Sequence, residues 1–343
     1  MNERRVPKDL GSSNLVELAD VRLSVRGRRQ TNEILRGVSL SIKRGEAFGL
    51  VGESGSGKSM TARSILGLLP AGSTVTGTVT FGEDDVSKLR PKALRALRAK
   101  RMAWIPQDPR TAIDPLHRCG HAVAEILHVN LGLSEKDARL RVPGLLAEVG
   151  IRDPDRVARA YPHELSGGLL QRVVIAMGLA CDPELIVADE PTTALDVTVQ
   201  AGIIRLFKRL TAERDVALLF ISHDLELVAG MCSQIGVMYA GRLVEVAAAE
   251  QLFRSPRHPY TAALLQARPN TDAERLANIP GRPPSSGEVV AGCAFHPRCP
   301  FALDTCRDQT PPLSRAQRGD SLIACWRADD PQVRDAIRGQ EEA

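Results

Sequence analysis

The chain has 343 residues, of which 43% are apolar, and its formal net charge is +4 at pH 7. This length fits about two domains, and so small a charge argues for no particular class of partner. An aromatic content of 3% weakens any base-stacking surface for nucleic acid, and no apolar run reaches the roughly 18 residues that cross a bilayer.

The predicted elements follow a simple order along the chain. Residues 1–14 are polar and lack the apolar core of a signal peptide, so we predict a disordered tail on a cytoplasmic chain. Residues 15–50 alternate apolar and polar side chains, which predicts strands. Between 117 and 180 the spacing is helical, and Pro143 either interrupts a helix or begins a new one. From 185 short apolar strands alternate with amphipathic helices, which indicates a parallel sheet covered by helices.

The stretch GESGSGKS matches the phosphate-binding pattern G-x-x-x-x-G-K-[ST] throughout. An apolar strand precedes it and a helix-like run follows, so its backbone N–H groups can wrap around phosphates at a helix start. We expect Lys58 to reach the β- and γ-phosphates of a nucleotide and Ser59 to hold Mg²⁺. The residues of this loop are Gly52, Glu53, Ser54, Gly55, Ser56, Gly57, Lys58 and Ser59.

Residues 86–101 are rich in Lys and Arg and contain no acid. Such a run forms either a nucleic-acid patch or the solvated face of a helix. Because no aromatic residues interleave with the basic ones, we expect the helix face and no nucleic-acid partner.

Polar residues follow three further apolar strands, where parallel α/β sheets build their sites. Asp189 and Glu190 end the stretch LIVADE, His223 follows LLFIS, and Gln107 follows AWIP. Asp189 is predicted to anchor Mg²⁺ and Glu190 to activate water as a general base. His223 would bind a γ-phosphate and orient the water, and Gln107 would sense both Mg²⁺ and the water.

The stretch ELSGGLLQR opens a helix with Ser166, Gly167 and Gly168. Bare N–H groups at a helix start make a second anion site. The chain therefore carries two predicted phosphate sites.

The composition changes near residue 255, which predicts a boundary between residues 15–255 and 256–343. The second part holds four cysteines with the spacing C-x5-C-x6-C-x18-C: Cys293, Cys299, Cys306 and Cys325. Four thiolates suit a [4Fe–4S] cluster or structural Zn²⁺, and the loops are wider than typical zinc knuckles, which favours iron–sulfur. Unligated thiols or a disulfide are the alternatives.

Over residues 15–255 these motifs resemble the nucleotide-binding subunit of ABC transporters. In the terms of that family, GESGSGKS is Walker A, Gln107 the Q-loop glutamine, LSGGLLQR the signature, LIVADE Walker B, Asp196 part of the D-loop and His223 the switch histidine. The resemblance implies an α/β P-loop NTPase (RecA-like) fold with an antiparallel β subdomain and an inserted helical subdomain. It also implies hydrolysis of ATP with Mg²⁺.

The same resemblance indicates which nucleotide the second phosphate site would bind. In this family two nucleotide-binding domains pack head to tail, so Ser166 and Gly168 would hold the γ-phosphate bound by the partner. The helical region 117–180, together with the segment after Gln107, is expected to dock onto membrane subunits.

The stretches DEPTTALDVTVQ and SPRHPYTAALL and the cysteine-rich tail are similar to oligopeptide/dipeptide permease ATPases. That subfamily imports peptides, and in some members nickel or glutathione, and some members are reported with an iron–sulfur cluster. The implied partners are a second ABC ATPase (identical or paralogous), two transmembrane permease subunits and an extracytoplasmic solute-binding protein. The implied location is the cytoplasmic face of the membrane.

The sequence departs from the family pattern at two positions. Val25 stands where an aromatic residue usually stacks on adenine, and Leu169 where a Gln often follows Ser-Gly-Gly. Aliphatic packing on adenine would replace stacking.

Two other readings compete with the transport ATPase. A soluble ABC ATPase of DNA repair would need long coiled coils, and one of translation would need a second cassette in the same chain; neither pattern is found. A P-loop kinase has no use for a signature motif that faces a partner.

Overall fold

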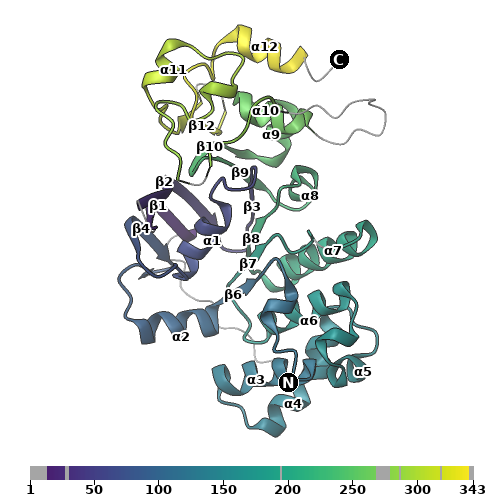
Figure 1. The fold of residues 1–343 in the computed structure, drawn as a ribbon. Coiled ribbons are helices and arrows are strands. Elements are labelled where there is room, and N and C mark those ends of the chain that lie inside the picture. The colour runs from purple at the N-terminus through teal and green to yellow at the C-terminus, as the bar shows by residue number, and fades with distance from the viewer. Residues whose placement is uncertain are drawn as a thin grey trace.

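The computed structural model describes residues 14–27, 31–193, 195–267, 279–285, 287–316 and 319–339. The predicted disordered tail lies outside these ranges apart from Asn14, which begins the first strand. Within the described ranges, no helix has the length and apolar character needed to cross a membrane. Figure 1 shows two sheets with helices packed around them.

The N-terminal strands form an antiparallel sheet in the order β2-β1-β4-β5. Its strands are β1 (Asn14–Arg26), β2 (Thr31–Lys43), β4 (Ser73–Phe81) and β5 (Asp84–Asp85). Leu18 of β1 pairs with Leu40 of β2 and Val79 of β4, and all three side chains are buried. The predicted strands of residues 15–50 are therefore confirmed.

A larger sheet, in the order β11-β12-β10-β9-β3-β8-β7-β6, forms the centre. Its strands are β3 (Ala47–Val51), β6 (Met102–Ile105), β7 (Leu185–Asp189), β8 (Ala217–Ile221), β9 (Gln234–Tyr239), β10 (Arg242–Ala248), β11 (Ser314–Arg315) and β12 (Leu322–Ile323). The strands β9, β3, β8, β7 and β6 run parallel to one another, whereas β10 pairs with β9 antiparallel.

Both faces of the central sheet are covered, and β7 shows the consequence. Leu185 and Val187 enter the core shared with the antiparallel sheet, whereas Ile186 and Ala188 enter the core shared with the helices. A strand buried on both faces must be apolar throughout. This explains the continuous apolar runs that the sequence shows before each polar cluster.

The helices predicted between 117 and 180 are present and lie together at one end of the molecule (Figure 1). They are α3 (Cys119–Leu131), α4 (Glu135–Glu148), α5 (Pro154–Arg159) and α6 (Gly167–Leu179). The prediction for Pro143 was wrong, because α4 runs through it. Its neighbours Val142 and Leu146 are buried, and their packing offsets the backbone bond that proline removes.

The basic run forms α2 (Pro91–Arg101), in which only Leu97 is buried. Arg101, at the end of this helix, pairs with Glu184 at 2.6 Å and with Asp84 at 3.1 Å. The expected solvated helix face is confirmed.

The remaining helices cover the sheet or follow it in the chain. They are α1 (Lys58–Leu66), α7 (Val197–Arg214), α8 (Leu225–Ala229), α9 (Ala249–Arg254), α10 (Pro259–Gln266), α11 (Asp304–Asp308) and α12 (Pro331–Gly339).

We call the described residues from 256 to 339 the C-terminal segment. It gathers at the end of the molecule opposite α3–α5 (Figure 1). Its strand β12 pairs with β10, so this segment extends the central sheet, and the pair Glu245–Ile323 fixes the register.

Candidate active site

The ends of four parallel strands bring the predicted catalytic residues to one edge of the sheet. Leu50 of β3 pairs with Ile221 of β8, and Ile221 pairs with Asp189 of β7. The next residue, Glu190, continues this register, because its N–H donates to the Ile221 carbonyl at 3.0 Å. The phosphate loop, Asp189–Glu190, His223 and Gln107 therefore all follow strands that end at this edge, which we call the catalytic edge.

The phosphate loop links β3 to α1 in a shape that only glycine permits at Gly52. Its φ is +147°, and a Cβ there would lie 2.2 Å from the Met238 carbonyl oxygen. No side chain caps the start of α1, and its first turn holds no acid. The exposed Ser54 and Gly55 form the tip of the loop, and the N–H groups behind them suit a phosphate.

Lys58 is folded back onto the loop. Its Nζ donates to the Gly52 carbonyl at 2.8 Å and to the Glu53 carbonyl at 3.1 Å. Burial lowers the pKa of Lys58, against the opposing effect of Glu190, Asp189 and Glu53. A bound phosphate would supply the negative charge that this buried ammonium lacks.

Ser59 and Asp189 meet beside the loop. The Ser59 hydroxyl donates to Asp189 Oδ1 at 2.9 Å. Burial raises the pKa of Asp189, while the Ser59 hydrogen bond lowers it. A hydroxyl and a carboxylate at this spacing are oxygen ligands of the kind that Mg²⁺ prefers, so the donor set fits the expected ion.

Glu190 is the centre of a polar cluster. Its Oε2 accepts from Gln107 Nε2 at 3.1 Å and lies 3.5 Å from His223 Nδ1. Thr193 Oγ1 donates to the same oxygen at 2.9 Å. The structure thus brings together the three residues predicted for water activation. Thr193 was missed, because nothing in the sequence distinguishes it from its neighbour Thr192.

The backbone at Glu190 is unusual, with φ at +49°. A non-glycine residue in the left-handed region costs free energy, and such residues cluster at functional sites. Here the turn directs the carboxylate back toward Gln107 and His223. It is held by the hydrogen bond from the Glu190 N–H to β8.

The second predicted anion site lies at the start of α6. Ser166 is the N-cap, and its hydroxyl accepts from the Leu169 N–H at 3.4 Å. A Cβ at Gly168 would lie 2.5 Å from Val199 Cγ1, so glycine permits the close packing of α6 on α7. Asp196 caps α7 by accepting from the Val199 N–H at 3.0 Å. In Figure 1, α6 lies with α3–α5, whereas α1 lies beside the antiparallel sheet, so the structure does not bring the two phosphate sites together.

Val25 lies in β1, where it pairs with Asn32 and Ser73 and packs on the core under the antiparallel sheet. Its predicted contact with adenine stays a prediction.

The four C-terminal cysteines line one small cavity together with His258, Phe295 and Trp326. All four are free thiols. Burial raises the pKa of Cys299 to about 11 and that of Cys325 to about 12. A metal would have to displace these protons. Four sulfur donors around one cavity are the donor set of a cluster or of zinc, but among the described residues no group of three or more His, Cys, Asp or Glu side chains is arranged to hold a metal ion.

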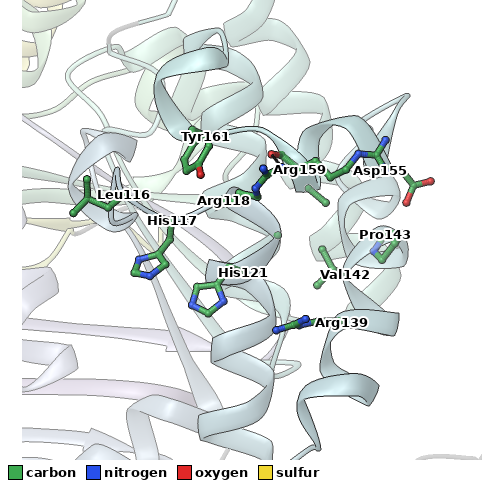
Figure 2. A pocket seen from close by; sticks show the side chains of 12 residues that line it. Leu116, His117, Arg118, His121, Arg139, Val142, Pro143, Asp155, Arg159 and Tyr161 are labelled. Carbon is green, nitrogen blue, oxygen red and sulfur yellow. Dashed lines mark hydrogen bonds between the residues drawn. The ribbon is translucent and has the colours of Figure 1, made fainter.

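A larger cavity of about 570 Å³ opens in the helical region, between α3, α4 and α5. Figure 2 shows Leu116, His117 and His121 along one side of it and Arg139 and Arg159 farther along its wall. Leu116 is 80% exposed, and the rings of His117 and His121 stack with centroids 4.7 Å apart. An exposed apolar side chain on the rim of a basic cavity marks a candidate contact surface.

Sequence reasoning missed Arg298 and Tyr260, which both contact Glu53 of the phosphate loop. An acid inside a phosphate-binding loop favours a nearby cation, but no local pattern in the sequence identifies Arg298 or Tyr260 as its partners.

The comparisons with known proteins agree with the two halves of the chain. Residues 35–193 match the family described as ABC transporter, and residues 244–306 match the oligopeptide/dipeptide transporter C-terminal region. A probable peptide ABC transporter ATP-binding protein of Sinorhizobium fredii is 45% identical over 92% of this chain and 96% of its own length. The dipeptide transport ATP-binding protein DppD of Escherichia coli is 44% identical over 85% of this chain and 90% of its own.

Solved structures extend the similarity to the fold. A dimeric post-hydrolysis state of an ATP-binding cassette, bound to ADP and Pi, is similar with a TM-score of 0.62 and 28% identity, over 68% of this chain and 98% of its own. A cassette of a cbiONQ transporter complex from Clostridium perfringens gives 0.61 and 26% identity, over 71% and 91%.

Proposed function

Because this chain belongs to the ABC transporter family, in its oligopeptide/dipeptide branch, we propose that it is the ATP-hydrolysing subunit of an importer of oligopeptides or dipeptides. The observation that carries ATP hydrolysis is the convergence of Gln107 and His223 on one oxygen of Glu190. The observation that supports peptides is the match of the C-terminal region to the peptide transporter family. Nickel or glutathione import is the alternative within the same branch.

The residues at the catalytic edge divide the work of hydrolysis. The loop N–H groups and Lys58 bind the β- and γ-phosphates of ATP. Ser59 and Asp189 would hold Mg²⁺, which would neutralise charge on the phosphates. Glu190 accepts a proton from the attacking water, a role that contributes roughly 10²–10⁴-fold. Gln107 and His223, which already contact Glu190, orient that water and the γ-phosphate.

The second phosphate site belongs to a dimer. We place Ser166, Gly167 and Gly168 of one chain against the nucleotide held by the loop of a second ABC ATPase chain, identical or paralogous. The support is that Ser166 and Gly167 are exposed at the start of α6, and that α6 lies apart from α1 within one chain (Figure 1), so a nucleotide held by a second chain would reach them. Loss of the γ-phosphate would then open the dimer.

The cavity between α3, α4 and α5 is the proposed contact with a membrane subunit of the transporter. A short cytoplasmic segment of a transmembrane permease subunit would cover Leu116 and enter the basic cavity of Figure 2. The chain would then act at the cytoplasmic face of the membrane, beneath two permease subunits that receive solute from an extracytoplasmic binding protein. Cross-linking from Leu116→Cys should capture a permease subunit, whereas Val289→Cys, also exposed but in the C-terminal segment, should not.

The domain division follows the same proposal, with residues 15–255 as the ATPase cassette and residues 256–343 as a cysteine-rich C-terminal domain. Its cysteines, Cys293, Cys299, Cys306 and Cys325, would hold a [4Fe–4S] cluster or, alternatively, Zn²⁺, which would cross-link segments that have little apolar core of their own. Iron, sulfide and zinc analysis after anaerobic purification distinguishes these. A folded, colourless protein with neither metal would refute both.

The decisive test of the function is purification of the chain with its membrane partners. We expect two permease subunits and a second ATPase chain, and ATP hydrolysis that rises when peptide and its binding protein are added. Co-purification with DNA-repair or ribosomal proteins instead would favour a soluble ABC ATPase.

A further inference from the structure

The phosphate loop contains an acidic residue, Glu53, which is bound by residues of the C-terminal segment. The two carboxylate oxygens of Glu53 pair with Arg298, Oε2 with Nη1 at 2.7 Å and Oε1 with Nη2 at 3.1 Å. The Glu53 N–H donates to the Tyr260 hydroxyl at 2.9 Å. Residues more than 200 positions away thus hold both the side chain and the backbone of one loop residue.

Arg298 is built into this position. Beyond Glu53, its Nε donates to the Pro280 carbonyl at 2.9 Å, its Nη1 to the Tyr239 hydroxyl at 3.4 Å, and its Nη2 to the Ile279 carbonyl at 3.3 Å. These contacts use all five N–H groups of the guanidinium. Its side chain is 4% exposed. A lysine could not reproduce this planar set of bonds.

The turn that carries Arg298 lies between two cysteines. The Cys293 carbonyl accepts from the His296 N–H at 2.9 Å, and the His296 carbonyl accepts from the Cys299 N–H at 3.2 Å. Both cysteines line the small cavity described above. The order of this turn therefore sets where the guanidinium stands relative to the loop.

Glu53 also lies next to the cation that binds phosphate, because its carbonyl accepts from Lys58 Nζ at 3.1 Å. An unbalanced carboxylate at this point would attract Lys58 and repel the phosphates of a nucleotide. Arg298 supplies the balancing charge through its two contacts with the carboxylate.

We propose that Arg298 and Tyr260 are positioning residues for ATP: Arg298 neutralises the Glu53 carboxylate, Tyr260 holds the Glu53 backbone, and together they fix the phosphate loop in its binding shape. The inference rests on the proposed ATPase activity. Because the loop is arranged before ATP arrives, its disturbance weakens binding in the ground state and the transition state alike. The expected signature is a raised KM with kcat unchanged.

The test measures KM and kcat of the full chain, and its affinity for the magnesium complex of a non-hydrolysable ATP analogue. Arg298→Gln should weaken affinity and raise KM about tenfold, as expected for loss of a charged hydrogen-bonded pair. The double variant Glu53→Gln/Arg298→Gln should recover affinity to within about threefold of the wild type, since the unbalanced charge is then gone. Arg327→Gln is the control: it breaks a pair with Asp330 in the same segment and should leave affinity unchanged.

Each other outcome overturns the inference. If Arg298→Gln binds nucleotide with wild-type affinity, or if the double variant shows no recovery, Arg298 stabilises only the C-terminal segment and does not position the phosphate loop. If Arg298→Gln fails to fold, Tyr260→Phe keeps the ring packing on Tyr239 and removes only the acceptor of the Glu53 N–H. It should raise KM about threefold, and an unchanged KM would contradict the proposal. A wild-type chain that binds no nucleotide would overturn the proposed function itself.

Discussion

The catalytic edge and the C-terminal segment both gather residues from distant parts of the chain, but they do so by different means. At the catalytic edge, parallel strands buried on both faces fix where each polar residue emerges. In the C-terminal segment, the strands are two residues long, and side chains connect distant stretches through hydrogen bonds, as Arg298 does to the Pro280 carbonyl and Arg327 to the Phe301 carbonyl. We therefore expect side-chain changes at the catalytic edge to alter the binding and hydrolysis of ATP, and most changes in the C-terminal segment to alter how well that segment is ordered.

The largest expected effect tests the first half of this comparison. Glu190→Gln should lower ATP hydrolysis by roughly 10²–10⁴-fold, because the amide cannot accept the proton of water. ATP binding and thermal stability should stay near wild type, since the side chain is not part of the core. Turnover is measured with released phosphate and binding by calorimetry. Glu213→Gln, on the exposed face of α7, is the matched control; substantial turnover in Glu190→Gln would remove Glu190 from its proposed role.

The next effect separates binding from chemistry at the same edge. Lys58→Ala should weaken ATP binding by about 10–100-fold, because the phosphates lose a charged hydrogen-bond donor. Equilibrium dialysis with labelled ATP measures the loss. Lys88 is exposed and pairs with Asp85 of β5, so the control variant Lys88→Ala should bind ATP as the wild type does. Equal affinity of the two variants would mean that the loop alone holds the nucleotide.

A mixed dimer tests whether one chain supplies all the residues of its own hydrolysis site or takes Ser166 from its partner. One copy carries Lys58→Ala and the other Ser166→Arg. If the signature acts on the partner's nucleotide, both defects fall in one composite site, and the other site keeps its intact set of residues. Single-turnover hydrolysis should then report about one active site per dimer. Two equally damaged sites would show that each chain uses its own Ser166.

The smallest effect on catalysis is expected from the other region. Cys325→Ser should make the C-terminal segment open more readily, with about tenfold faster proteolysis there, while kcat stays within twofold of wild type. Cys181→Ser, in the helical part of the chain, controls for the loss of a thiol. A large fall in kcat without faster cleavage would place Cys325 in the catalytic machinery and erase the contrast between the regions.

The sequence predicted the catalytic edge well because its signals are local. An apolar run followed by polar residues marks both the strand and its end, so the positions of Asp189, Glu190 and His223 followed from the parallel arrangement alone. The prediction at Pro143 failed because tertiary packing of α4 outweighed the tendency of proline to end a helix. The contact of Arg298 with Glu53 could not be predicted, because no periodicity relates two residues 245 positions apart.

The C-terminal segment extends the central sheet, so strand β10 is not its outermost strand. Without β12, strand β10 would present its unpaired N–H and carbonyl groups to other chains, an invitation to edge-to-edge pairing. The short strand β12 covers β10 at Glu245 and Val246, and the sheet then ends in β11, whose two residues are too short to template another strand. It also supplies the Arg257 and His258 N–H groups that bind the buried Glu245 carboxylate of β10 at 3.0 Å each. A chain shortened to the ATPase cassette alone would therefore leave β10 open to pairing with other chains and would remove the two N–H donors of the Glu245 carboxylate at the same place.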